Sequence, residues 1–328
     1  MPRYEAEVTS LSWIPVEAMT GLLRVPVDLG VGHYDPPPPD RIEDLEMLRS
    51  QDRFRFANHL RAFIEIEGAE VKAAGYLGSG LLGATTLNLG GHLVKVPAVA
   101  FPDLQHPPQV GATGVRFVQT AGGRTGAPLP RRISRPPFLQ LTAPSAWTTL
   151  ALTIGFEGEA SFEVLGASPF PRHWIYDNQG ALAQKSALID FARWAAESSH
   201  DHSPWSDHDE AARVVDAETA VERSLSVEIM GAKPVFRRFP PGESIVQQGA
   251  RGSELFLILD GIAEVSIDGE VVALAGPGAI LGERAALEGG IRTATVTAQT
   301  PVRVAVSEAV NLDRDALREV AAQHRPPT

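Results

Sequence analysis

The sequence contains no cysteine among its 328 residues. Without thiols the chain has no disulfide framework, no thiolate nucleophile and no cysteine-based zinc site. The N-terminus also lacks a basic region followed by an apolar run, and no stretch approaches the roughly 18 apolar residues of a membrane-spanning helix. We therefore expect a cytoplasmic protein with no membrane partner and no bound metal.

The sequence also has few basic residues: it contains 29 Lys and Arg against 40 Asp and Glu, which gives a net charge of −11. Affinity for nucleic acid depends largely on neutralising phosphates with basic side chains. The deficit extends over the whole chain, and residues 233–328 are slightly acidic by themselves. The charge distribution therefore argues against a nucleic-acid partner.

Short apolar runs separated by glycine and proline dominate the first 180 residues. We expect strands at 54–67, 93–101, 115–120, 138–141, 147–154 and 161–165. This spacing is typical of an antiparallel β-barrel or sandwich. Four prolines at 36–39 predict a stiff, extended spacer, and Asp40 is positioned to cap a short helix over 41–50.

The pattern becomes helical between 181 and 232. We expect one helix around 188–195 and a second at 210–229. The second carries an apolar stripe made of Val214, Ala217, Val221 and Leu225. This segment is therefore predicted to be a helical connector between two β-rich domains, at 1–180 and 233–328.

Strands return after residue 235, with a glycine in almost every gap. We expect them at 236–239, 244–247, 254–259, 262–267, 270–274, 294–298 and 302–306, before a final helix at 311–324. This regular spacing of short strands and glycines predicts a small, closed or double-sheet β-domain. The expected fold class is mainly β with helices: an N-terminal antiparallel β-barrel or sandwich, a helical connector and a C-terminal β-domain.

The most specific motif lies between residues 278 and 296. It predicts a short helix over Glu283–Leu287, and a helix N-terminus suits an anion. Arg292 offers a guanidinium suited to a phosphate, and the Glu283 carboxylate can accept hydrogen bonds from sugar hydroxyls. Three small residues allow a ligand to approach the backbone: Ala285, Ala286 and Ala294. Phosphate, ribose and close approach together describe a nucleotide pocket.

This motif, Gly282-Glu283-x-Ala285-x-Leu287-x4-Arg292-Thr293-Ala294-Thr295-Val296, resembles the phosphate-binding cassette of cyclic nucleotide-binding domains. Such domains occur in catabolite-activator-type regulators, protein kinase A regulatory subunits and cyclic-nucleotide-gated channels. The resemblance continues upstream, in Phe239-x-x-Gly242-Glu243-x-Ile245-x-x-Gln248-Gly249 and Gly252-x-x-Leu255-Phe256-x-Ile258-x-x-Gly261-x-x-x-Val265. It covers residues 235–315, and the whole chain resembles bacterial two-domain proteins that carry such a domain.

The resemblance implies a β-roll that binds cyclic AMP or cyclic GMP. Arg292 would pair with the exocyclic oxygens of the cyclic phosphate, Glu283 would bind the ribose 2′-hydroxyl, and the Thr293 hydroxyl would reach a purine or the phosphate. Two positions depart from the family, Arg284 where it prefers an apolar residue and Ile291 where it often has proline. The implied binding site comprises Gly282, Glu283, Arg284, Ala285, Ala286, Arg292, Thr293 and Ala294.

We accordingly expect a cyclic-nucleotide sensor that signals through its flanking helices to the N-terminal domain or a partner, with a homodimer through the stripe on 210–229. Two alternatives stay open: a nucleotide-gated enzyme with its active site in the N-terminal β-barrel, and a structural or assembly protein with a degenerate nucleotide domain. The sequence has no nucleophile elbow, metalloprotease helix or dinucleotide fingerprint, so no catalytic residue is named. Because the predicted β-roll lies close to Thr328, we expect no helix-turn-helix after it. The base would be covered by Leu312, by Leu317 or by the N-terminal domain, or it would stay partly exposed.

Four other features have a functional and a structural interpretation. The His- and acid-rich run 199–210 favours a polar linker over a metal site, and the glycines of 122–126 favour a hairpin turn over an anion nest. His173 is interpreted as a core or interface histidine rather than a general base, and His33 as part of a loop.

Overall fold

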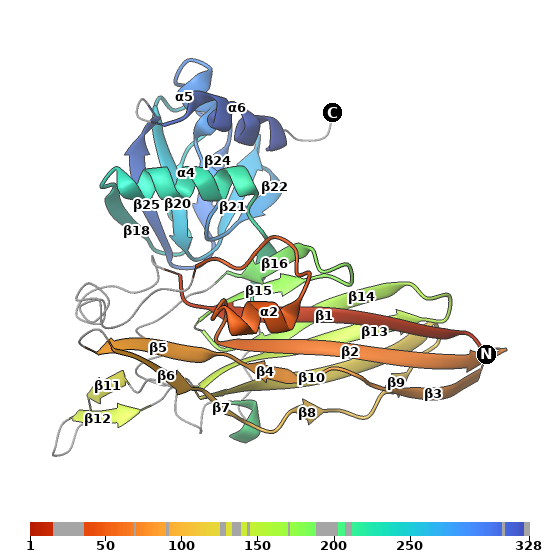
Figure 1. Cartoon of the computed structure of the whole chain (residues 1–328). Coiled ribbons are helices and arrows are strands. Elements are labelled where there is room, and N and C mark those ends of the chain that lie inside the picture. The colour runs from red at the N-terminus through yellow and green to blue at the C-terminus, as the bar shows by residue number, and fades with distance from the viewer. Residues whose placement is uncertain are drawn as a thin grey trace. The chain divides into compact units, whose positions relative to one another are not determined.

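The computed structural model describes the following residues: 1–15, 36–68, 70–89, 92–124, 129–132, 139–142, 145–169, 171–187, 203–206, 212–309 and 312–324. The chain divides into two compact units, Met1–Val214 and Val215–Thr328. Antiparallel strands dominate both units (Figure 1). The predicted fold class, mainly β with helices, is therefore confirmed.

The first unit contains two antiparallel sheets. One has the strand order β17-β16-β15-β1-β2-β3 with β4 on β2, and the other has the order β14-β13-β10-β7 with β8 and β9 on β10. The first sheet is built from β1 (Arg3–Trp13), β2 (Phe56–Glu67), β3 (Glu70–Tyr76), β4 (Gly80–Leu82), β15 (Arg172–Tyr176) and β16 (Leu182–Ser186), and it ends with β17 (Val214–Asp216), of which only Val214 belongs to the first unit. The second is built from β7 (Val99–Ala100), β8 (Leu104–Gln105), β9 (Gln109–Val110), β10 (Gly114–Arg124), β13 (Ser145–Gly155) and β14 (Ala160–Ala167).

Apolar side chains from both sheets fill the space between them. The cluster includes Val8, Leu60, Ile64, Phe117, Leu150 and Ile154, all fully buried. Their alternation with outward-facing residues is the two-residue period of a strand with one buried face. Neither sheet closes on itself, so the first unit is an open sandwich rather than a barrel.

Smaller elements complete the first unit. Two hairpins join β5 (Ala84–Leu89) to β6 (His92–Pro97) and β11 (Leu129–Arg132) to β12 (Leu139–Thr142), and η3 (Pro204–Ser206) is a single 3-10 turn. Helix α2 (Leu45–Ser50) begins four residues later than predicted, because Asp44 and not Asp40 accepts the hydrogen bond from the Met47 amide.

The region predicted as a helical connector differs most from expectation. Residues 182–186 form strand β16 and 214–216 form strand β17, while the helix expected around 188–195 lies outside the described residues. Helix α4 (Ala220–Gly231) begins late because Thr219 and Glu222 form a reciprocal capping box at its N-terminus. Val214 and Ala217 therefore precede the helix, and the predicted stripe is reduced to its last two members.

The second unit is a β-roll made of two four-stranded antiparallel sheets, ordered β18-β25-β20-β23 and β19-β24-β21-β22. Its strands are β18 (Val235–Phe239), β19 (Ser244–Val246), β20 (Glu254–Asp260), β21 (Ala263–Ile267), β22 (Glu270–Ala275), β23 (Ile280–Leu281), β24 (Thr295–Ala298) and β25 (Val302–Glu308). Alternate residues of these strands, such as Phe256, Ile258, Val296 and Val304, form the interior core. The strands predicted after residue 235 all correspond to these elements.

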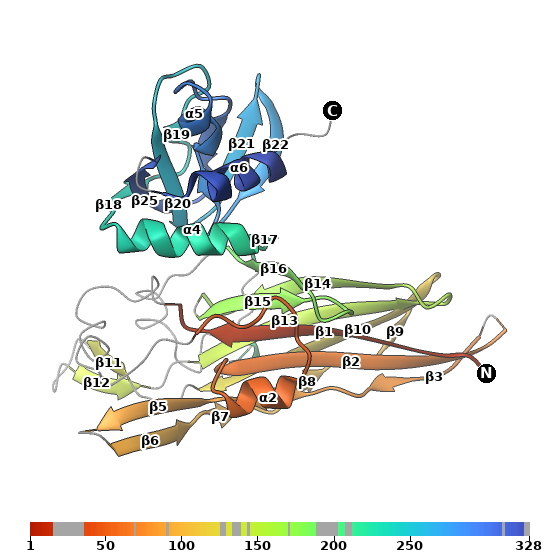
Figure 2. The ribbon, with the colours of Figure 1, turned by 45° about the horizontal axis from the view of Figure 1, so that its top comes forward.

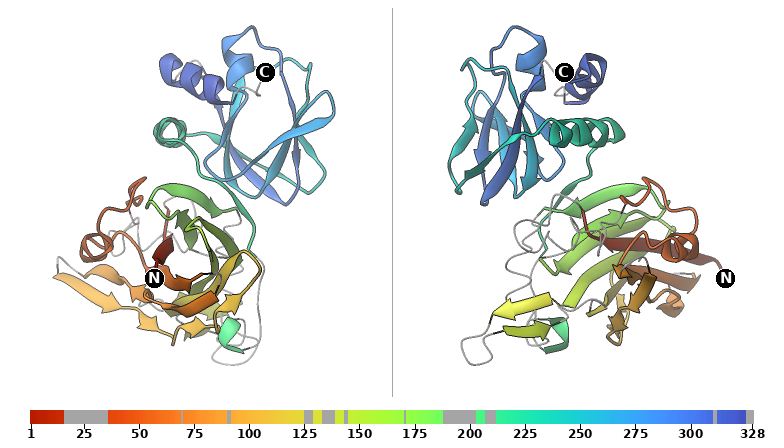
Figure 3. Two further views of the ribbon diagram at one scale, coloured as in Figure 1. Left: turned by 90° about the vertical axis from the view of Figure 1, so that its right-hand side faces the viewer. Right: turned by 60° about the vertical axis from the view of Figure 1, so that its left-hand side comes forward.

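Three helices, α4, α5 (Glu283–Leu287) and α6 (Arg314–Gln323), lie outside the roll (Figures 2 and 3). They bury a second core against the opposite face of β20, through Leu255 and Leu257. Leu225 of α4 and Leu317 of α6 are almost completely buried there, and Leu312 is buried beside them. Leu312 and Leu317 thus belong to the helix core and not to the interior of the roll.

Candidate functional site

The cassette backbone turns sharply where β23 meets α5. Gly282 adopts a left-handed conformation with φ of 91°. This conformation is strained for any residue that has a side chain, but glycine adopts it without that cost. The amide of Ala286 donates to the Gly282 carbonyl at 3.1 Å and closes the first turn. In a helix the amides before this point have no intrahelical acceptor, so those of the first turn are available to an anion. The helix predicted at Glu283–Leu287 is confirmed.

Arg292 extends under this turn and is almost fully buried, with 4% of its side chain exposed. Its Nη1 atom donates to the carbonyl of Glu254 at 2.9 Å and approaches that of Gly282 at 3.4 Å. Its guanidinium also lies 5.4 Å from the ring centroid of Phe256. A Cβ at Gly252 would lie only 2.7 Å from Nη2. The guanidinium is thus fixed by backbone on two sides.

Charge around Arg292 is incompletely neutralised. The closest carboxylate oxygen that the described part of the chain offers is Oε2 of Glu254, 3.8 Å from Nη2 and beyond hydrogen-bond range. Burial lowers the pKa of Arg292, while the negative charges of Glu254 and Glu283 act in the opposite direction. A buried cation without a hydrogen-bonded carboxylate favours the arrival of an anion such as a phosphate.

Glu283 is buried beside this cation and contacts a residue that sequence analysis did not assign to the site. His324, which follows α6, places Nδ1 3.3 Å from Oε1 of Glu283 and Nε2 3.4 Å from Oε1 of Glu222. The contact with Glu222, and to a smaller extent that with Glu283, raises the pKa of His324 to about 10. Burial acts to raise the pKa of Glu222, but hydrogen bonds from His324 and Thr219 outweigh it and the pKa is lowered.

The other predicted site residues surround this centre at different depths. Ala285 is buried, while Ala286 packs against the helix core. Thr293 and Ala294 are half-buried where the chain leads into β24. Arg284 forms an ion pair with Glu288 at 3.7 Å, and Glu288 is not one of the carboxylates near Arg292. The structure therefore brings Gly282, Glu283 and Arg292 together most closely.

The alternative candidates take other roles or lie outside the described residues. His173 is fully buried, its ring contacts Ser12 at 2.7 Å and the carbonyl of Ser168 at 3.0 Å, and burial lowers its pKa to about 4. It is a core histidine, as predicted. Gly122 and Gly123 lie inside β10 and not in the predicted hairpin turn. A Cβ at either position would collide with a neighbouring strand, so the close pairing of the strands requires glycine there. His33 and most of 199–210 are not described.

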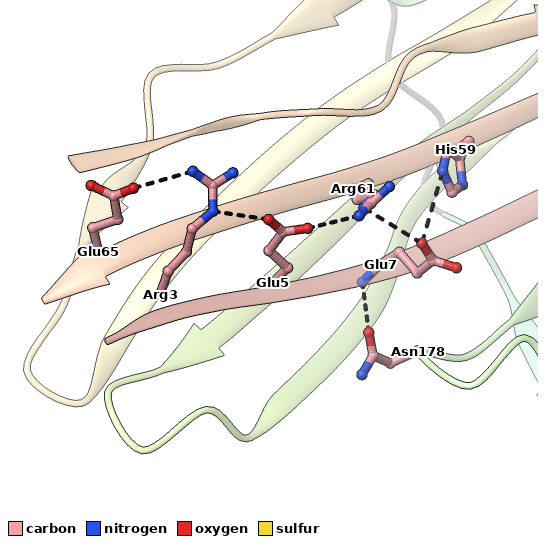
Figure 4. A network of polar contacts seen from close by, with 7 residues as sticks. All are labelled: Arg3, Glu5, Glu7, His59, Arg61, Glu65 and Asn178. Carbon is pink, nitrogen blue, oxygen red and sulfur yellow. Dashed lines mark hydrogen bonds and ion pairs between the residues drawn. The ribbon is translucent and has the colours of Figure 1, made fainter. Parts of the chain in front are cut away.

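A row of alternating charges crosses β1 and β2 on the outside of the first unit (Figure 4). It links Glu65, Arg3, Glu5 and Arg61 through contacts of 2.7–3.1 Å. These side chains are one-third to one-half exposed, so each pair contributes little and is screened by salt. Among the described residues no cluster of histidines and carboxylates has the arrangement of a metal site, and no helix is both long and apolar enough to cross a bilayer.

Comparison with known families agrees with this geometry. Residues 236–324 match the family model of the cyclic nucleotide-binding domain. The C-terminal third of the chain carries such a domain. The cassette residues Gly282, Glu283 and Arg292 all fall within the matched segment.

Similarity to individual proteins is confined to the same third. The chain is 37% identical over 86 residues to a cGMP-dependent protein kinase of Eimeria tenella, and 42% identical over 65 residues to one of Plasmodium berghei. These alignments cover 26% and 20% of this chain, and each covers 8% of the kinase's length. A solved cyclic nucleotide-binding domain from Methylobacillus flagellatus is 31% identical, covering 27% of this chain and 50% of its own, with a TM-score of 0.22.

Proposed function

We propose that this protein is a cyclic-nucleotide sensor whose β-roll binds cyclic AMP or cyclic GMP. The observation that carries the proposal is the buried guanidinium of Arg292, held by main-chain carbonyls and without a hydrogen-bonded carboxylate in the described residues. A cyclic phosphate supplies one negative charge and two exocyclic oxygens, which match the fork of a guanidinium. The family match over residues 236–324 supports the same ligand class.

Each polar group of the cassette has a part in this proposal. Arg292 pairs with the exocyclic phosphate oxygens, and the first-turn amides of α5 share the same charge. Glu283 accepts the ribose 2′-hydroxyl, and Thr293 contributes a hydroxyl to the phosphate or the purine. Glycine at 282 keeps the approach open, since a Cβ there would collide with Arg292.

Signalling requires a part of the domain that differs between two states, because a ligand shifts a population only through different affinities for them. The cross-bonded sheets of the roll are poor candidates, whereas α4 and α6 pack against α5 of the cassette through a shared apolar core that lies outside the sheets. Glu222 of α4 accepts from the Ile280 amide at 3.4 Å, just before the cassette. We propose that α4 and α6 transmit binding to the first unit or to a partner.

Calorimetric titration of the full chain with cyclic AMP and cyclic GMP tests the ligand, with 5′-AMP as an acyclic control. The change Arg292→Gln should weaken binding by about 2–4 kcal/mol because it removes a charge-assisted phosphate pair. Arg318→Gln is the matched control. This arginine is exposed, and within the described residues its one ion pair is with Asp315, which is exposed as well. Equal binding by wild type and Arg292→Gln would refute the cassette assignment.

A further inference from the structure

His324 lies between two buried carboxylates from different helices. The side chains of Glu222 and Glu283 are 5% and 7% exposed, whereas that of His324 is 35% exposed. One imidazole nitrogen faces each carboxylate, at 3.4 Å and 3.3 Å. The residue at the end of α6 is therefore the point at which α4, α5 and α6 are joined electrostatically.

A histidine in this position is a cation at neutral pH, because the two carboxylates raise its pKa to about 10. Removing the imidazole would leave two buried carboxylates facing each other across the vacated position, which is costly. The contact thus stabilises the docking of α6 and at the same time occupies Oε1 of Glu283. That oxygen belongs to the side chain assigned above to the ribose hydroxyl.

We propose that His324 holds Glu283 in the nucleotide-free protein and releases it to the ribose hydroxyl when a cyclic nucleotide binds, freeing the end of helix α6. This inference rests on the proposed function of the cassette. If ribose and imidazole compete for one carboxylate, nucleotide binding and α6 docking oppose each other by the same free energy in both directions. His324 is a positioning residue: it touches Glu283 and acts on the nucleotide through it.

Nucleotide affinity gives the first test. In full-length protein His324→Gln should bind cyclic AMP or cyclic GMP at least about fivefold more tightly, because the neutral amide competes less well for Glu283. His324→Lys, which restores a cation, should return affinity toward the wild-type value. Gln323→Ala, on the exposed end of the same helix, is the matched control and should leave affinity unchanged.

A double-mutant cycle separates competition from general loosening of the fold. In a Glu283→Gln background the effect of His324→Gln on affinity should disappear, since the shared carboxylate is gone. If His324→Gln does not fold, Glu222→Gln serves in its place. Glutamine also fulfils the capping-box position, so this change weakens the hold on His324 while keeping the start of α4. Weaker or unchanged nucleotide binding by His324→Gln, or by Glu222→Gln where that variant takes its place, would overturn the proposal.

Amide exchange gives the second test. Saturating nucleotide should increase exchange over 314–324 in wild type, and His324→Gln should produce the same increase without nucleotide. Unchanged exchange in both cases would overturn the release of α6. A wild type that binds neither nucleotide refutes the proposed function. The competition then stands only if His324→Gln binds one of them, and it falls if that variant binds neither.

Discussion

Gly282 and Arg292 share one small volume, because a Cβ on Gly282 would collide with Nη1 of Arg292 and lie 2.8 Å from the Glu254 carbonyl. Substituting Gly282 by alanine therefore imposes two costs, a left-handed backbone at φ of 91° and displacement of the guanidinium. We expect Gly282→Ala to lower the free energy of unfolding of the second unit by about 3 kcal/mol. Affinity for cyclic nucleotide should fall about tenfold as the arginine moves.

Gly242 provides the control for this prediction. Its φ is 85°, almost the same as that of Gly282, but a Cβ there meets no atom within 4 Å. Gly242→Ala should cost only the conformational part, about 1 kcal/mol, and should leave nucleotide affinity unchanged. Chemical denaturation and calorimetric titration of both variants check the two parts separately. Equal losses of affinity in the two variants would contradict the shared-volume interpretation.

The β-roll could be predicted from sequence because local signals and tertiary structure agree there. Several of the predicted strands are bounded by residues with a left-handed backbone, such as Gly261 and Gly269, which have φ of 89° each. Strand β1 carries a weaker signal and was not predicted. Its inner face ends in Ser10 and Ser12, both buried, so the alternation of apolar and polar residues disappears although the strand is central.

In the candidate site, too, the residues of one continuous motif could be predicted from sequence, whereas a contact between distant residues could not. The cassette is one short continuous segment, so Gly282, Glu283 and Arg292 could be predicted from its resemblance to a known family motif. The contact between His324 and Glu283 joins residues 41 positions apart, and no local pattern indicates it. The start of α4 was placed too early because apolar periodicity continues through Val214, whereas the capping box with Thr219 decides where the helix begins.

The buried imidazole of His173 predicts acid sensitivity of the first unit. Burial lowers its pKa from 6.5 to about 4, so the unfolded chain binds this proton more readily than the folded one. The stabilising contribution is therefore complete above pH 6.5 and is lost as pH falls toward 4. The total loss should be about 3 kcal/mol, at about 1.4 kcal/mol per pKa unit.

Tryptophan fluorescence measures this effect selectively, because all five tryptophans lie before residue 206 and hence in the first unit. Denaturation monitored by emission should show a steeper loss of stability between pH 6.5 and 4 in wild type than in His173→Gln. His106→Gln, in which an exposed histidine is replaced, should keep the wild-type slope. A slope that is the same in all three proteins would assign the acid sensitivity to carboxylates instead.

Electrophoretic mobility with duplex DNA checks the charge argument. With a net charge of −11 we expect no salt-sensitive shift at low ionic strength, with or without cyclic nucleotide. A basic DNA-binding protein of similar size serves as the positive control. A complex that sharpens on adding cyclic AMP would contradict the prediction and point to a transcriptional output.

The homodimer predicted through α4 needs a surface other than the original stripe. Leu225 and Ile229 are fully buried within their own unit, whereas Val227 is 74% exposed. If α4 is the interface, Val227→Asp should convert a dimer into a monomer in sedimentation velocity, because it places a charge in an apolar contact. Val271→Asp, at an exposed position of β22, is the matched control and should leave the sedimentation coefficient unchanged.

Helix α4 is also the element through which nucleotide binding should first become visible beyond the cassette. Glu222 caps its N-terminus, accepts from the Ile280 amide and contacts His324, so three separate elements depend on one carboxylate. A ligand that changes the His324 contact must alter the electrostatic balance of this cap. We therefore expect cyclic nucleotide to change amide exchange over 210–235 as well as over 278–296. Protection confined to 278–296 would mean that the domain binds its ligand without signalling through α4, and a parallel change in tryptophan emission would show that the signal reaches the first unit.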